Sequence, residues 1–107
     1  MSKKGNMAFK IIYTPLAKKS FKQNIQHLEE NWTINEIKKF IQKTSDVIDI
    51  LKENPLVFPL WEYNKTIRKV VLLKQITLFY EFDENNVYIH LFWNNYQDPD
   101  RIKYLLE

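Results

Sequence analysis

The hydrophobic positions of this 107-residue chain change their period along its length, and each period predicts a different element. Apolar residues alternate with other residues over Phe9–Tyr13, which predicts a short first strand. Thr14-Pro15 is typical of a helix start, because threonine can accept from a free backbone N–H and proline lacks the N–H that would stay unpaired. From there the apolar residues recur at helical spacing as far as Trp32. The sequence therefore predicts a strand that leads directly into an amphipathic helix.

A second helix is predicted immediately after the first. Thr33 and Glu36 have the spacing of a capping box, in which each side chain would satisfy a free backbone N–H of the first turn. The apolar helical period then continues as far as Asn54, and Pro55 disfavours a helical residue before it. Two helices joined by a tight turn predict an antiparallel αα-hairpin.

Three strand patterns follow, over residues 66–73, 76–82 and 87–93. Short polar turns separate them, so they are expected to pair as antiparallel neighbours. Asp98-Pro99 then starts a short last helix. The predicted fold is α+β: a strand, an αα-hairpin and a three-stranded antiparallel meander, with the helices on one face of the sheet. A single domain over residues 9–107 is expected to follow a flexible basic leader, residues 1–8.

The sheet face that points away from the helices is predicted to be a partner site. This face has too much apolar surface to be left to water, and no second helical layer remains in the sequence to cover it. Arg68 and Glu81 are alternatively expected to pair across neighbouring strands. Strict alternation places these residues on the face: Arg68, Phe79, Glu81, Tyr88, His90 and Phe92.

The composition excludes several kinds of site. The chain has no cysteine, and its only glycine is Gly5, so disulfides, thiolate metal sites, P-loops and dinucleotide fingerprints are ruled out. Its two histidines, His27 and His90, are far apart in the sequence, and a multi-histidine metal site is not expected. No apolar run approaches the roughly 20 residues that a bilayer span needs. We expect a cytoplasmic protein with no metal, no cofactor and no membrane partner.

The positive charge is concentrated near the start of the chain. The formal net charge is +3, yet residues 1–28 contain six lysines and no acidic residue. Lys18, Lys19 and Lys22 flank the apolar stripe of the first helix. They are either an ordinary solvated face or a surface that attracts an acidic protein or a nucleic acid.

The order of the motifs resembles the RelE/ParE superfamily of toxins from bacterial type II toxin–antitoxin pairs. The resemblance extends from Phe9 to about Leu105 and depends on the segments FKIIYTPLAKKSF, LKENPLVFP, TIRKVV, ITLFYEFDENNVYIHLFW and QDPDRI. It implies a small toxin that a cognate antitoxin binds and silences, over the open sheet face and the groove beside the helices. The residues expected to bind partners are Lys18, Lys19, Lys22, Phe79, Tyr88 and Phe92.

The two branches of the superfamily imply different targets. RelE-like toxins cleave messenger RNA on the ribosome, and ParE-like toxins inhibit DNA gyrase. Arg68 matches the arginine of the second strand, but Asn94-Asn95-Tyr96 stands where many members read histidine, any residue, arginine. Because that nuclease pattern is incomplete, the sequence favours a ParE-like toxin acting on gyrase or another macromolecule.

Two alternatives stay open. One is a metal-free, ribosome-dependent mRNA endonuclease that uses Arg68 with His90 or Tyr96 as catalytic residues. Histidine titrates near neutral pH and tyrosine can exchange a proton or stack on a base. In a purely structural interpretation, His90 is a hydrogen-bonded sheet residue and Tyr96 is a packing or antitoxin contact. The other alternative is a non-toxic binding module of the same fold.

Overall fold

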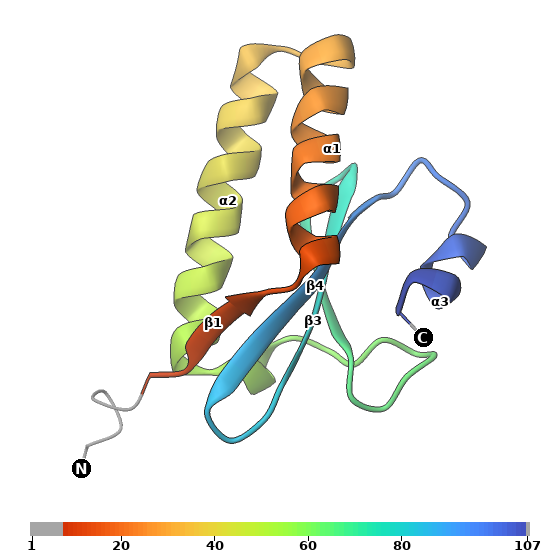
Figure 1. The fold of residues 1–107 in the computed structure, drawn as a ribbon. Helices are drawn as coiled ribbons and strands as arrows, with labels where there is room; N and C mark the ends of the chain where they lie inside the picture. Colours follow the sequence, from red (N-terminus) through yellow and green to blue (C-terminus); the bar gives the residue numbers. More distant parts are fainter. Residues whose placement is uncertain (1–7, 107) are drawn as a thin grey trace.

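The computed structural model describes residues 8–106, which form one α+β unit in which a helical hairpin packs on a mixed sheet (Figure 1). The predicted leader, residues 1–8, lies outside the described residues except for Ala8. The elements are β1 (Lys10–Tyr13), α1 (Pro15–Asn31), α2 (Ile34–Glu53), a 3₁₀ turn η2 (Pro55–Val57), β2 (Arg68–Leu73), β3 (Ile76–Phe82), β4 (Asn86–Asn94) and α3 (Asp100–Leu106).

The two long helices begin where the sequence predicts them. Thr14 caps α1 through its Oγ1, which accepts from the Ala17 N–H at 3.1 Å. The predicted capping box of α2 is wrong: Thr33 is the N-cap residue, but its side chain makes no capping hydrogen bond. The Glu36 carboxylate instead contacts Lys39 and Gln75, so a tertiary contact replaces the local one. Within residues 8–106, neither helix is apolar enough over its length to cross a membrane.

The sheet has the order β1-β4-β3-β2. The predicted antiparallel meander of β2, β3 and β4 is confirmed. The first strand differs, because β1 pairs in parallel with β4, with Tyr13 opposite Ile89. Parallel neighbours need a long connection, which the αα-hairpin and the meander together supply.

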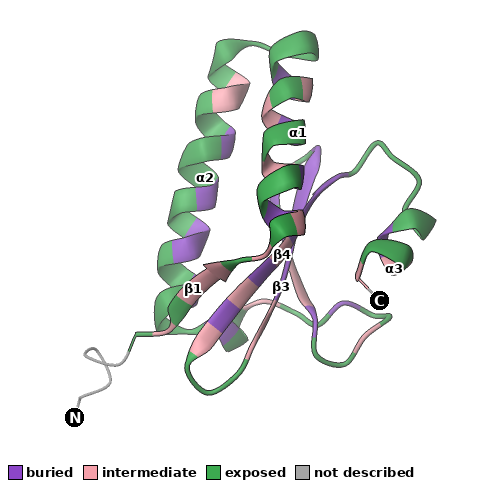
Figure 2. Ribbon diagram, viewed as in Figure 1, coloured by how far each residue is buried: buried purple, intermediate pink, exposed green. Residues whose placement is uncertain are grey.

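The main core lies between the helical hairpin and one sheet face (Figure 2). Phe21 and Phe40 stack at 5.0 Å between ring centroids, and Phe92 from β4 meets both rings edge-on. Tyr80 is completely buried, its hydroxyl donates to the Pro55 carbonyl at 2.6 Å, and burial raises its pKa to about 12. The other fully or nearly buried members are Ala17, Leu28, Val47, Ile48, Leu51, Val70, Leu72, Ile76, Leu78, Val87 and Ile89.

A second, smaller core covers part of the opposite sheet face. The loop over residues 59–67 returns along β2, where Trp61 N–H donates to the Ile67 carbonyl at 2.7 Å. From the other side, α3 places Ile102 against the same face. The expectation that nothing would cover this apolar surface is therefore wrong. The buried residues of this core are Trp61, Ile67, Phe79, Leu91, Trp93 and Ile102.

In the C-terminal half of β4, side chains of α1 bond the strand edge where no neighbouring strand of the described residues pairs with it. Beyond Tyr13, β1 no longer pairs with β4, and the edge of β4 would lack partners. Ser20 Oγ accepts from the Phe92 N–H at 3.0 Å, and Asn24 Nδ2 donates to the Phe92 carbonyl at 2.8 Å. Both side chains are buried, so these bonds satisfy backbone groups that water cannot reach.

We predict that Ser20→Ala destabilises the fold although alanine has the higher helix propensity. The variant leaves the buried Phe92 N–H without its acceptor, which should lower the free energy of unfolding by about 1–3 kcal/mol. Urea denaturation followed by circular dichroism measures this change. Ser45→Ala, an exposed position on α2, is the control and should stay within about 0.5 kcal/mol of the parent. Equal stability of the two variants would contradict the role given to Ser20.

Candidate functional site

A β-bulge in β4 determines which side chains reach the open sheet face. Phe79 pairs with Leu91 and the next residue, Tyr80, pairs with Ile89, so His90 is the extra residue. The bulge shifts the alternation of β4 by one position. His90 stays on the open face, whereas Phe92 points into the helix-side core.

The bulge and the second core bury two residues of the predicted partner surface. Phe92 is 2% exposed and packs against the helices, and Phe79 is 2% exposed beneath the second core. Neither side chain is exposed on the open sheet face, although Phe92 contributes to the lining of the grooves beside α1. Strict alternation predicted Phe92 on the wrong face because the bulge has no signature in the sequence of β4.

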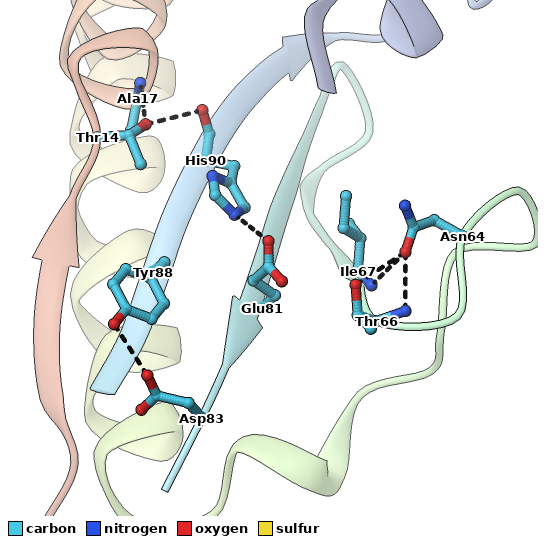
Figure 3. Close-up of polar contacts among 9 residues, drawn as sticks. All are labelled: Thr14, Ala17, Asn64, Thr66, Ile67, Glu81, Asp83, Tyr88 and His90. Atoms are coloured by element: carbon cyan, nitrogen blue, oxygen red, sulfur yellow. Dashed lines mark hydrogen bonds and ion pairs between the residues drawn. The ribbon is translucent and has the colours of Figure 1, made fainter. Parts of the chain in front are cut away.

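His90 and Glu81 form a close pair on the open face (Figure 3). The His90 Nε2 and Glu81 Oε1 atoms are 2.6 Å apart, with side chains 24% and 35% exposed. The backbone of His90 is also held, because Thr14 Oγ1 donates to its carbonyl at 3.3 Å. A carboxylate that accepts from Nε2–H leaves Nδ1 as the basic nitrogen of the ring. No hydrogen bond engages that nitrogen within residues 8–106, so it is available to a ligand as a hydrogen-bond acceptor.

Tyr88 and Asp83 lie beside this pair at the β3–β4 turn. Tyr88 is two residues from His90 on the same strand, and its hydroxyl donates to Asp83 Oδ2 at 2.9 Å (Figure 3). Asp83 Oδ1 accepts from the N–H groups of Asn85 and Asn86, at 2.9 and 2.8 Å. These backbone bonds, with the Tyr88 hydroxyl, lower the pKa of Asp83, and the bond to Asp83 raises the pKa of Tyr88.

Arg68 lies on the helix side of the sheet, away from His90. It pairs across the sheet with Tyr80, which faces the main core, whereas Glu81 faces the opposite way. Its Nη1 donates to the Phe58 carbonyl at 2.7 Å, and its guanidinium lies 5.8 Å from the centre of the Phe82 ring. The predicted Arg68–Glu81 pair is therefore wrong, and the structure does not bring Arg68 and His90 together.

The sequence-based reasoning missed a lysine on the same face as His90. Lys69 pairs with Phe79 in the sheet, and its Nζ is 3.0 Å from Glu62 Oε1. Two strand spacings, about 10 Å, separate its backbone from that of β4 near Leu91. Because side chains alternate along a strand, Lys69 and Arg68 point to opposite faces of the sheet. This alternation is the sequence signal that would have identified Lys69.

Tyr96 is exposed but lies away from the histidine. Its N–H donates to Asn94 Oδ1 at 2.9 Å in the loop after β4, and its side chain is 60% exposed. Asn94 is four residues from His90, or about 13 Å along the strand. The structure therefore does not bring Tyr96 next to His90.

The three lysines of α1 are exposed and point to two different grooves. Lys18 and Lys22 line a groove of about 600 Å³ between α1 and α2, together with Lys52 and the half-exposed Ile41. Lys19 lines a separate groove, between α1 and the C-terminal segment. Among the described residues, no three His, Asp or Glu side chains gather in a way that could hold a metal ion.

The fold and the site define a class: a small α+β domain whose four-stranded sheet has a helical hairpin on one face and a histidine–carboxylate pair on the other. Solved structures of toxins share this fold. The YoeB dimer from Staphylococcus aureus matches with a TM-score of 0.56 and 14% identity, over 80% of this chain and 95% of that one. The DinJ–YafQ toxin–antitoxin complex from E. coli matches with a TM-score of 0.57 and 16% identity, over 83% and 94% of the two chains. The α+β fold that the resemblance implied is thereby confirmed.

Comparison of sequences gives no such match. No protein-family model matches the chain, and no curated protein is similar to it in sequence. The likeness is therefore structural, and the chemistry of this chain has to be argued from its own residues.

We predict that the contribution of Asp83 to stability depends on pH. Its pKa is depressed in the folded state, so the stabilisation is complete above the ordinary value of 3.8 and is lost as the pH falls through the lower folded value. Asp83→Ala should lower the melting temperature at pH 7, and the difference from the parent should shrink below pH 4. Thermal denaturation from pH 7 to pH 2.5 measures it.

Glu84→Ala, at the exposed neighbouring position, is the matched control and should leave the melting temperature close to that of the parent at every pH. A difference between Asp83→Ala and the parent that stays constant down to pH 2.5 would show that the carboxylate does not supply the stabilisation.

Proposed function

We propose that this protein is the toxin of a type II toxin–antitoxin pair and that it cleaves RNA in the manner of RelE-like toxins, with His90 and Glu81 as the proton-transfer pair. The single observation that carries this proposal is the 2.6 Å contact between His90 and Glu81 on an accessible sheet face. The fold supports the toxin role, and both structural neighbours are RelE-like toxins.

The pair can supply the base that RNA cleavage needs. His90 Nδ1 removes the proton of a ribose 2′-hydroxyl, the 2′-oxygen bonds to the adjacent phosphorus, and the bond to the 5′-oxygen breaks. The leaving 5′-oxygen takes up a proton from water, and the His90 imidazolium later returns its proton to solvent. The products are a 2′,3′-cyclic phosphate and a 5′-hydroxyl. Glu81 fixes the ring tautomer and stabilises the imidazolium that forms, as a carboxylate does behind a catalytic histidine.

Lys69 can supply the positive charge for the phosphate. It is on the same sheet face as His90, and its partner Glu62 is exposed, so the ion pair can open at little cost. A cation aimed at the phosphate stabilises the charge that develops in the transition state. Arg68, which the sequence suggested for this role, is held by backbone carbonyls on the other face.

This proposal replaces the ParE-like reading that the sequence favoured. That reading depended on the missing histidine and arginine after the last strand. The structure instead pairs a histidine with a carboxylate on the open sheet face. The structural neighbours fit the RelE-like alternative better than the ParE-like one. An incomplete motif at one position is thus a weak argument against a nuclease.

The groove between α1 and α2 fits the antitoxin. Its floor is apolar, with Phe21 and Ile48, and Lys18, Lys22 and Lys52 surround it with only Asp49 opposed to them. An acidic segment with apolar side chains on one face would complement both features. We place the cognate antitoxin in this groove, where it would bind the toxin in the cytoplasm.

The nuclease proposal predicts that His90→Gln and Glu81→Gln each lower the rate of RNA cleavage by about 10²–10⁴-fold, because the base or its orienting partner is lost. The measurement is cleavage of a defined messenger RNA on purified ribosomes by the full chain. Glu84→Gln is the matched control and should cleave like the parent.

Two outcomes would overturn the nuclease proposal. One is unchanged cleavage by His90→Gln. The other is growth arrest of induced cells with intact messages and DNA damage signalling, which indicates a gyrase target. Unimpeded growth of induced cells with a folded protein would show the non-toxic alternative to be right.

The antitoxin proposal predicts that Lys18→Glu combined with Lys22→Glu weakens binding of the small acidic protein encoded beside this chain by at least tenfold, through lost charge complementarity. Calorimetry at two salt concentrations measures the affinity and its salt dependence. Lys38→Glu combined with Lys43→Glu, two exposed positions on α2 outside the groove, is the control with the same net charge. Equal affinity of the double variant and the control would place the antitoxin elsewhere.

A further inference from the structure

A second groove lies between α1 and the C-terminal segment, and the proposed antitoxin site does not include it. Its volume is about 530 Å³, within the range of small-molecule sites. α1 forms one wall, α3 the other, and the end of β4 the floor. The residues that the following argument uses are Lys19, Asn24, Phe92, Trp93, Arg101 and Leu105.

Asn24 lines this groove and has a buried hydrogen-bond acceptor without a partner among the described residues. The residue is 4% exposed, and its Nδ2 donates to the carbonyls of Ser20 and Phe92 at 2.9 and 2.8 Å. These two bonds fix the amide so that Oδ1 is the free end, and Oδ1 has no hydrogen-bond partner among residues 8–106. A buried acceptor without a partner is costly, so its presence in a groove indicates a ligand with an N–H donor.

The walls of the groove add an apolar surface and positive charge. Trp93 and Leu105 supply the apolar surface, and Lys19 and Arg101 approach from opposite walls, on α1 and α3. Both cations are exposed, and Arg101 makes a single side-chain bond, to Gln97 at 3.2 Å. Among residues 8–106, Glu30 is the one acidic side chain that lines the groove. An N–H donor, a flat apolar body and a negative charge are together the features of a nucleotide.

The groove is also next to the proposed cleavage site. Its floor is the strand that carries His90, and Phe92 and Asn94 are about 7 and 13 Å farther along β4. At about 3.4 Å per nucleotide in a stacked strand, this span corresponds to roughly two to four nucleotides. One RNA chain can therefore pass His90 and enter the groove.

We propose that this groove binds one nucleotide of the RNA substrate: its base donates an N–H to Asn24 Oδ1, and its phosphate binds Arg101 and Lys19. The inference depends on the proposed RNA cleavage and assigns part of its specificity to bases that offer an N–H donor. A peptide segment also offers N–H groups, but the two cations favour the nucleotide.

The test is a titration of the ¹⁵N-labelled full chain with uridine monophosphate, followed by NMR. We expect the side-chain amide of Asn24 and the backbone signals of Trp93 and Arg101 to shift. N3-methyluridine monophosphate lacks the N–H of the base and should bind at least tenfold more weakly. Uridine, which lacks the phosphate, should also bind more weakly.

Substitutions of the two cations test the phosphate half of the site without altering the buried side-chain amide of Asn24. Lys19→Gln with Arg101→Gln should weaken uridine monophosphate about tenfold and leave uridine unchanged. Lys38→Gln with Lys43→Gln, both outside the groove, is the matched control for charge. Equal binding of the methylated and unmethylated nucleotides would overturn the role of Asn24, and equal binding by the double variant and the control would overturn the role of the cations.

Three further outcomes test this inference, and the last two separate it from the proposed function. If N-acetylglycine N-methylamide shifts the Asn24 signals and uridine monophosphate does not, the groove binds a peptide and the inference is wrong. RNA cleavage that depends on His90, in the absence of nucleotide binding here, would leave the proposed function intact and reject the groove alone. Binding without any RNA cleavage would support the groove and reject the nuclease.

Discussion

The free edge of β4 is the constraint on which the rest of the structure depends. A strand in the interior must pair its backbone on both sides, and β1 covers only the first part of β4. Three polar side chains, from the N-cap and the first ten residues of α1, bond the remainder of this edge: Thr14, Ser20 and Asn24. Their bonds fix where α1 crosses the sheet, and the aromatic contacts between the helices and Phe92 then follow.

The same edge positions the chemistry. At the point where β1 ends and α1 begins, β4 bulges at His90, and Thr14 holds the carbonyl of the extra residue. The bulge keeps the imidazole on the open face beside Glu81 and returns Phe92 to the core. Bulges that redirect a side chain are common next to active sites. One local arrangement thus satisfies backbone groups at the edge of β4 and also places His90 beside Glu81 on the open face.

The helix α3 and the loop over residues 59–67 cover part of the open face. Ile102 packs the short helix α3 onto Trp61 and Phe79, and the Lys103 ammonium lies 4.1 Å from the centre of the Tyr63 ring. These contacts join the C-terminal segment to the loop over residues 59–67, and they leave the region around His90, Glu81 and Lys69 accessible. The apolar part of the face is buried within the chain, and the polar part is left for a ligand.

The sequence by itself determined the order and type of the elements, because hydrophobic period, the Thr14-Pro15 start and the proline after Asn54 are local signals. It also determined that His90 and Glu81 share a face, since alternation holds up to the bulge. Only the tertiary structure decided that they pair, that Arg68 turns away and that Phe79 and Phe92 are buried. Those outcomes depend on register, on a bulge and on packing by α3, which are long-range contacts that no local pattern records.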